Sequence, residues 1–214
     1  MASTASTSDI DIASRALVLI GAEPISSFSG TTTESQVATN LYEDIVRSSL
    51  TQTRWRFASN IAQLSRLTDV PVDENKYASA YQIPTESLII HGIAVNGQQI
   101  DYDIFTKKIF CNANTNDIVI GEYTYRPDTT EFPPYYILGL QFHLASVFSG
   151  AIAEDENKSL LFEQKAQQQY MIARNIDSQQ TTTERLNLNR FSTCLLYTSP
   201  SPRDLSTSRM PSSA

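Results

Sequence analysis

The chain has 214 residues, of which 41% are hydrophobic and 18% charged, and its formal net charge is −7 at pH 7. This length suffices for one domain with a good core, or for one domain that carries a smaller insert. The acidic balance argues against a protein that grips nucleic-acid phosphates, which usually needs a basic face. The chain lacks a signal-peptide pattern and a run of about eighteen apolar residues, so we expect a soluble, cytosolic-type protein without a membrane span.

The C-terminal segment 194–214, CLLYTSPSPRDLSTSRMPSSA, resembles a translated sequencing adapter. Back-translation of 194–204 matches the transposase end and adapter of tagmentation libraries, and 208–214 matches the flow-cell end of the same oligonucleotide in the same frame. A native Ser/Pro-rich tail is the alternative. We interpret the segment as adapter-derived and exclude it from reasoning about the fold. Residues 1–193 then carry a net charge of −8 and one cysteine, Cys111, which we expect on a strand as a small apolar residue.

Two helices are predicted in the N-terminal part. Ser8 or Asp9 can cap the first helix, and Gly21 stands where a left-handed residue would end it. Thr33 and Gln36 form a capping-box pattern, which predicts the start of a second helix with a stronger apolar stripe.

The character of the sequence changes near residue 70. From there to about residue 131, short runs rich in Ile, Val, Tyr and Phe alternate with turn residues, which predicts antiparallel strands. Asn96 and Gly97 between two apolar runs indicate a two-residue hairpin, and Lys107 with Lys108 indicates a hairpin tip. We interpret 62–67, before this part, as a short helical stretch or a packed loop.

Two more helices are predicted after the strands. The segment 135–152 is apolar on most faces, so we expect it at the centre of the core. The acidic run 154–156 would begin the last helix, over about 157–176, whose apolar stripe is thin and whose other faces carry glutamines. From 177 to 193 the chain becomes rich in Gln, Thr and Asn, which indicates an extended arm.

We therefore predict an α+β fold, namely a mainly α-helical bundle with an embedded small antiparallel β-domain and an extended C-terminal arm. Residues 8–69 and 132–176 would form a discontinuous helical body, 70–131 the β-rich insert and 177–193 the arm. Aromatic residues are the candidate anchors of the core or of an interface: Trp55, Phe57, Phe142, Phe162 and Tyr170.

Enzyme signatures are weak in this sequence. His91 and His143 are the only histidines, and each lies in an apolar segment, where a satisfied structural histidine is the better interpretation. Clustered metal ligands, phosphate-binding glycine loops and nucleophile elbows do not occur. We expect no catalytic residue, no metal and no cofactor, which favours an assembly protein over an enzyme.

Five stretches in one order carry a resemblance that spans most of residues 8–176. They are 16–28 (ALVLIGAEPISSF), 41–50 (LYEDIVRSSL), 54–58 (RWRFA), 81–88 (YQIPTESL) and 134–145 (PYYILGLQFHLA). Together they resemble the tail tubular protein A family, the head–tail adaptors of short-tailed bacteriophages. Thr85 and Glu86 stand where family members often carry an Asp after the proline.

The resemblance implies a structural virion protein, assembled in the host cytoplasm. It implies a homo-oligomeric ring, a dodecamer, that joins the portal protein to the tail nozzle protein and lets double-stranded DNA pass through its lumen without specific binding. It also implies that the C-terminal segment reaches the portal. By position the docking residues would be Arg185, Leu186, Leu188, Arg190 and Phe191.

A tube that conducts DNA should not bind its cargo, so an acidic wall that repels phosphates is favourable. We therefore expect several of Glu43, Asp44, Asp155 and Glu156 to face the lumen. A closed ring needs two different patches on each subunit. We expect them on the last predicted helix and on exposed apolar residues of the β-rich insert.

Three alternatives remain open at this point. The chain could be another tail-completion or connector protein of a virion, or a virion hydrolase that degrades the host envelope. It could also be a plain bacterial binding domain. A hydrolase would require a carboxylate pair or a nucleophile–base pair in a cleft.

Overall fold

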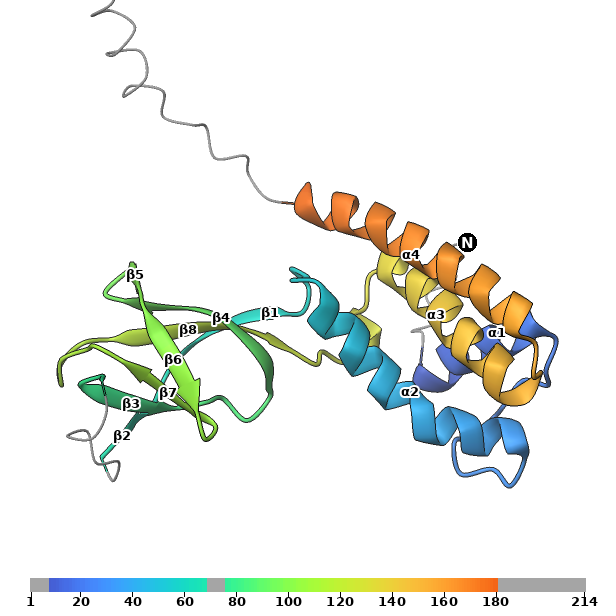
Figure 1. Cartoon of the computed structure of the whole chain (residues 1–214), viewed down its shortest axis with the longest axis horizontal. Coiled ribbons are helices and arrows are strands. Elements are labelled where there is room, and N and C mark those ends of the chain that lie inside the picture. The colour runs from blue at the N-terminus through green and yellow to red at the C-terminus, as the bar shows by residue number, and fades with distance from the viewer. Residues whose placement is uncertain (1–7, 69–75, 181–214) are drawn as a thin grey trace, which may run out of the picture. The chain divides into compact units, whose positions relative to one another are not determined.

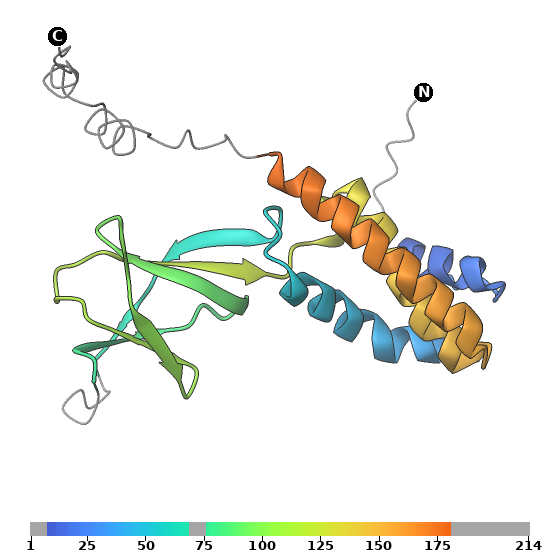
Figure 2. The same cartoon turned by 45° about the horizontal axis from the view of Figure 1, so that its top comes forward.

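The computed structural model describes residues 8–68 and 76–180. The described residues form four helices and two antiparallel sheets, and the helices and the strands gather in separate parts (Figures 1 and 2). The helices are α1 (Asp9–Ile20), α2 (Thr33–Gln52), α3 (Pro134–Ile152) and α4 (Glu156–Ser178), and a short 3-10 helix, η1 (Thr129–Glu131), precedes α3. The predicted α+β class is confirmed, while the predicted arm lies almost wholly outside the described residues.

The strands form two four-stranded antiparallel sheets. The first has the order β1 (Ser59–Gln63), β8 (Val119–Tyr125), β4 (Ser87–Val95) and β5 (Gln98–Ile100). The second has the order β2 (Arg66–Leu67), β3 (Ser79–Gln82), β7 (Lys108–Cys111) and β6 (Tyr102–Phe105). Because β1 leads into β2 and β5 leads into β6 over very few residues, the chain passes from the first sheet to the second at two corners.

Local signals placed several element ends correctly. Ser8 caps α1 and forms a capping box with Asp11, and Gly21 ends the helix with a φ of 86°. Asn96 and Gly97 join β4 to β5 with φ values of 51° and 84°, as a tight hairpin requires. The second hairpin turns at Thr106 and Lys107, so the predicted tip is one residue late, because Lys108 already belongs to β7.

Two predictions in the N-terminal half are wrong. The cap of α2 is Thr32, whose side chain accepts a hydrogen bond from the Ser35 amide. Thr33, which the sequence pattern predicted as the capping residue, is the first residue of the helix. Ala62 and Gln63 belong to β1 and residues 66–67 to β2, so the helical alternative is wrong, and only the connection of Leu64 and Ser65 between the two strands is a packed loop. The helical body therefore ends before residue 59, since β1 pairs with the distant β8.

The boundary at the end of α4 also needs correction. The helix continues to Ser178, and Asp177, predicted as the first residue of the arm, is only 4% exposed. Its carboxylate accepts hydrogen bonds from the Arg56 amide (2.9 Å) and from the Tyr135 hydroxyl (2.8 Å). Asp177 therefore holds the end of α4 against the body.

Helix α3 is the central helix of the bundle and packs against α1, α2 and α4 (Figure 1). Tyr136, Leu140, Leu144 and Phe148 on it are fully buried, as predicted for an apolar core helix. By length and composition alone, α3 is also long enough to cross a membrane, a test that the core helix of a globular protein passes as well. Its burial by the other helices accounts for that apolar composition.

Candidate assembly surfaces and polar junctions

An aromatic cluster fixes the α2–β1 loop against α3 and α4. Trp55, 1% exposed, lies 5.3 Å from the Tyr136 ring and 6.2 Å from the Tyr170 ring, centroid to centroid. Phe57 lies 4.9 Å from the same Tyr136 ring. Such contacts add stabilisation beyond the burial of apolar area. These three predicted anchors therefore meet around a residue that the sequence did not single out.

The other two predicted anchors form a separate contact between α3 and α4. The rings of Phe142 and Phe162 are stacked with centroids 6.4 Å apart, and Phe162 is 8% exposed. All five aromatic residues thus contribute to the packing of the subunit itself.

Tyr136 also carries a buried polar contact at the centre of this cluster. Its hydroxyl and that of Ser49 are 2.6 Å apart, and the Trp55 indole donates to the Ser49 carbonyl at 3.1 Å. Burial raises the pKa of Tyr136, so its hydroxyl stays protonated and can donate. The contact fixes the register of α2 against α3.

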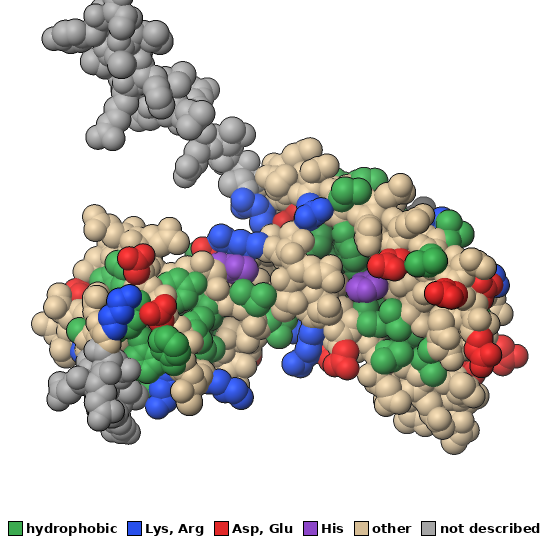
Figure 3. Space-filling view, viewed as in Figure 1, with side chains coloured by type: hydrophobic (Ala, Val, Ile, Leu, Met, Phe, Trp, Pro, Cys, Tyr) green, Lys and Arg blue, Asp and Glu red, His purple; other side chains and the backbone are tan. Residues whose placement is uncertain are grey.

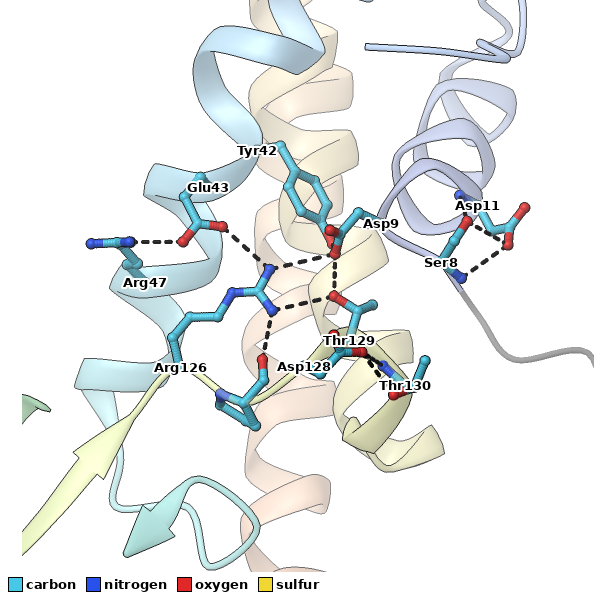
Figure 4. A network of polar contacts seen from close by, with 11 residues as sticks. Ser8, Asp9, Asp11, Tyr42, Glu43, Arg47, Arg126, Asp128, Thr129 and Thr130 are labelled. Atoms are coloured by element: carbon cyan, nitrogen blue, oxygen red, sulfur yellow. Dashed lines mark hydrogen bonds and ion pairs between the residues drawn. The ribbon is translucent and has the colours of Figure 1, made fainter. Parts of the chain in front are cut away.

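A polar junction centred on Arg126 joins α1, α2 and the segment after β8 (Figure 4). The Arg126 guanidinium lies 3.2 Å from the Glu43 carboxylate and 3.4 Å from that of Asp9. Burial alone would lower the pKa of Arg126, but Glu43 and Asp9 outweigh this effect and raise it. Asp9 also accepts hydrogen bonds from the hydroxyls of Tyr42 and Thr129. The Arg126 guanidinium thereby connects the segment after β8 to α1 and α2, which lie far away along the chain.

Two of the four acidic residues that were predicted to face the lumen are paired with neighbouring cations. Glu43 is paired with both Arg126 and Arg47, and Asp155 caps α4 and lies 3.6 Å from Lys158. Within residues 8–68 and 76–180, no ion pair includes Asp44 or Glu156. Of the four predicted lumen acids, these two keep an unneutralised charge at the surface.

The two histidines, His91 and His143, and Cys111 lie where they contribute to the packing of the fold. His91 lies 2.6 Å from the Thr124 hydroxyl, His143 lies 3.4 Å from that of Tyr170, and burial lowers the pKa of both. Cys111 is fully buried on β7, where burial raises the pKa of its thiol. In the part of the chain that the structure describes, His, Cys, Asp and Glu do not gather into a group of three or more suited to a metal ion.

The outward side of α4 carries large apolar side chains beside its glutamines, which the sequence analysis missed. Its inner stripe of Phe162, Ala166 and Ala173 is buried, as predicted. On the opposite side, large apolar side chains are 40–52% exposed: Leu160, Leu161, Met171, Ile172 and Ile176. At 3.6 residues per turn they lie within one half of the helix circumference. We call this set the α4 outer face.

A second apolar surface belongs to the β-rich part. Ile104 and Phe105 at the β6–β7 hairpin are 44% and 58% exposed, and Ile118 before β8 is 52% exposed. Figure 3 shows hydrophobic side chains at the surface over both the strands and the helices. We call Ile104 and Phe105, which are neighbours at the end of β6, the β surface. The α4 outer face and the β surface are thus two unlike apolar surfaces among the described residues.

The candidate docking residues of the arm, Arg185, Leu186, Leu188, Arg190 and Phe191, lie outside the described residues. Residues 194–214 also lie outside them. The described chain ends at Gln180, three residues after the buried Asp177.

No family model matches the sequence, and no curated protein matches it.

Proposed function

We propose that this protein is a structural adaptor of a short-tailed phage virion, which forms a ring between the portal and the tail tube. The observation that carries the proposal is the α4 outer face, because a surface helix that buries one side and exposes five large apolar side chains on the other is suited to a partner. The kind of assembly, a head–tail adaptor ring, is suggested by the five sequence stretches that resemble the tail tubular protein A family and follow one another in the same order.

Two unlike surfaces support a ring over a simple dimer. A cyclic ring is built from heterologous contacts, in which one patch of a subunit meets a different patch of the next. The α4 outer face and the β surface offer such a pair, and the Arg126 junction stiffens the connection between the parts that carry them. In this proposal the ring binds the portal on one side and the nozzle on the other, and uses neither a cofactor nor a catalytic residue.

The lumen of the ring would be acidic or neutral. Asp44 and Glu156 are the candidates for this wall, since Glu43 and Asp155 are already paired. Repulsion of DNA phosphates at such a wall would let the genome slide without binding. A strongly basic lumen in an assembled ring would contradict this part of the proposal.

The experiment that tests the function is to mix the purified full chain with the portal protein of the same phage and to image the complex. We expect a closed ring on the portal, with twelve subunits. A portal that stays bare at micromolar subunit concentrations would contradict the adaptor role. A ring found elsewhere in the tail would favour another connector.

A further inference from the structure

A cleft of about 680 Å³ opens in the β-rich part beside β4 and β6. Its lining is mainly apolar, with Ile83, Leu88 and Ile90 half-buried and Ile104 exposed. Because Ile104 also belongs to the β surface, the cleft adjoins that surface. Lys107, exposed at the turn between β6 and β7, is the one charged residue among those that line the cleft. The cleft therefore combines an apolar wall with a single lining cation.

The first half of α4 carries the complementary features. Leu160 and Leu161 of the α4 outer face are 52% and 49% exposed. Glu163 lies three residues after Leu160, so the two side chains are neighbours on the helix surface. The Glu163 carboxylate accepts a hydrogen bond from the Gln167 amide at 3.3 Å, and among the residues that the structure describes it belongs to no ion pair. This half of α4 therefore joins two exposed leucines to an unneutralised negative charge.

The cleft and this half of α4 do not cover each other within one subunit, since Leu160 and Ile104 are both exposed. A helix that carries apolar side chains on one face can bind in an apolar groove. Clefts of about 300–1,000 Å³ bury most of the surface of a drug-sized ligand, so a cleft of this volume can accept two leucine side chains. The helix that fills the cleft can therefore come from a second copy of the chain.

Charge determines which side of α4 would face the cleft. Glu163, beside Leu160, would attract Lys107. Lys165 would repel Lys107, and it lies two residues after Glu163, so the two side chains point in nearly opposite directions from the helix axis. Like charges that meet across an interface suppress the wrong arrangement. The favoured arrangement therefore turns Glu163 towards Lys107 and Lys165 away from it.

We infer that the first half of the α4 outer face of one copy docks in the β-rich cleft of a neighbouring copy, with its two exposed leucines against the apolar wall and Glu163 paired with Lys107. The inference rests on the proposed ring, because it names the contact through which neighbouring subunits hold each other. The helix and the cleft are different surfaces, so the contact runs head to tail, as ring closure requires. The predicted C-terminal arm takes no part in it and stays with the portal contact that the family resemblance implies.

Chemical cross-linking between two populations of the full chain tests the contact, with the portal protein of the same phage present. All variants carry Cys194→Ser, while the buried Cys111 is kept. One population carries Gln82→Cys, at an exposed residue that lines the cleft. The other, with a different tag, carries Gln164→Cys, at an exposed residue of α4 beside Leu160. A short bis-maleimide should give a cross-linked heterodimer, because docking holds the two cysteines together far above their bulk concentration.

Matched variants separate docking from chance encounters. We expect a heterodimer yield roughly tenfold above that of a control that pairs Gln82→Cys with Gln36→Cys, at an exposed residue of α2. Lys107→Glu in the first population should lower the yield about two- to fivefold, as the loss of an ion pair at an interface does. Glu163→Lys in the second population should restore the yield. Glu23→Lys, which makes the same change of charge at an exposed loop position, should not restore it.

Three results would overturn the inference. The first is a yield no higher than that of the Gln36→Cys control. The second is a yield that does not respond to Lys107→Glu, or that Glu163→Lys restores no better than Glu23→Lys. The third is the loss of portal binding by isolated Lys107→Glu subunits, because this would place the portal in the cleft.

Imaging of the wild-type chain with its portal separates this inference from the proposed function. A closed ring without the cross-link refutes only the docking of α4 in the cleft. A cross-link without a closed ring refutes only the adaptor ring.

Discussion

The helical part and the β-rich part of this molecule differ in the size of the hydrophobic core that they bury. One cluster of 21 buried residues joins all four helices, and the Arg126 and Asp177 contacts close its ends. The strands bury two smaller clusters, of seven and three residues, and among the described strands part of β4 and one side of β6 have no pairing partner. The helical part therefore has the features of a rigid frame that carries the α4 outer face on its surface, and the β-rich part has smaller cores.

The substitution with the largest expected effect on stability is Trp55→Ala. Trp55 is buried at the centre of the aromatic cluster and donates to the Ser49 carbonyl, so its loss creates a cavity and an unpaired acceptor. We expect the free energy of unfolding to fall by about 3–5 kcal/mol in urea denaturation. The matched variant Phe105→Ala, at the exposed tip of the β surface, should change it by less than about 0.5 kcal/mol. Similar losses in the two variants would contradict the assignment of Trp55 to the core and of Phe105 to the surface.

The next test removes the cation of the polar junction. In Arg126→Ala the Asp9 and Glu43 carboxylates lose their shared partner, and we expect a loss of about 1–3 kcal/mol in the free energy of unfolding. The control is Arg47→Ala, which also removes a Glu43 partner but at a side chain that is 57% exposed. That pair should contribute only about 0.3–0.5 kcal/mol and weaken in high salt. An Arg126 effect no larger than the Arg47 effect would show that the junction does not stiffen the frame.

A pair of glycine substitutions probes one position in each part, with opposite expected signs. Gly97 has a φ of 84° in the β4–β5 turn, so Gly97→Ala should cost about 1 kcal/mol of stability. Gly150 lies in α3 with open space around its Cα, so Gly150→Ala should stabilise the protein by about 0.4–1 kcal/mol. Thermal unfolding of both variants measures this, and a stabilising Gly97→Ala would contradict the assigned turn.

The smallest expected effect concerns alkaline pH and the end of α4. Burial, and then the hydrogen bond to Asp177, raise the pKa of Tyr135 to about 12. Because this pKa lies above the value of about 10 in the unfolded chain, its contribution to stability is complete below pH 10 and is lost as the pH rises towards 12. Tyr135→Phe should therefore lose less stability than the wild type between pH 10 and 12. Unfolding midpoints across that range measure it, and parallel curves would contradict the linkage.

The sequence predicted the elements whose ends depend on near neighbours. Ser8 finds its capping partner three residues away, and Gly21 and Gly97 need only their own backbone conformations. The strands at 59–67 were missed because Ser59 pairs with Thr124, a partner that no local pattern reveals. Where pairing is distant, local composition does not decide the element.

The residues of the aromatic cluster, the polar junction and the apolar surfaces were predicted only in part, because many of their partners are also distant along the chain. The five aromatic anchors were found because large aromatic residues are usually buried. The roles of Tyr136 and Arg126 were missed, since their partners come from α1 and α2, far away along the chain. The α4 outer face was missed because its apolar residues are interspersed with glutamines, a composition that predicts a polar face.

The most direct test of the account is assembly of an Ile172→Asp variant on the portal, imaged beside the wild type. Ile172 is 49% exposed on the α4 outer face, so the substitution should leave the unfolding midpoint unchanged while it places a charge in the subunit contact. The control Ser48→Asp adds the same charge at an exposed position of α2. The account predicts closed rings for the wild type and for Ser48→Asp, and none for Ile172→Asp. Rings of equal occupancy in all three would contradict the claim that the α4 outer face assembles this protein.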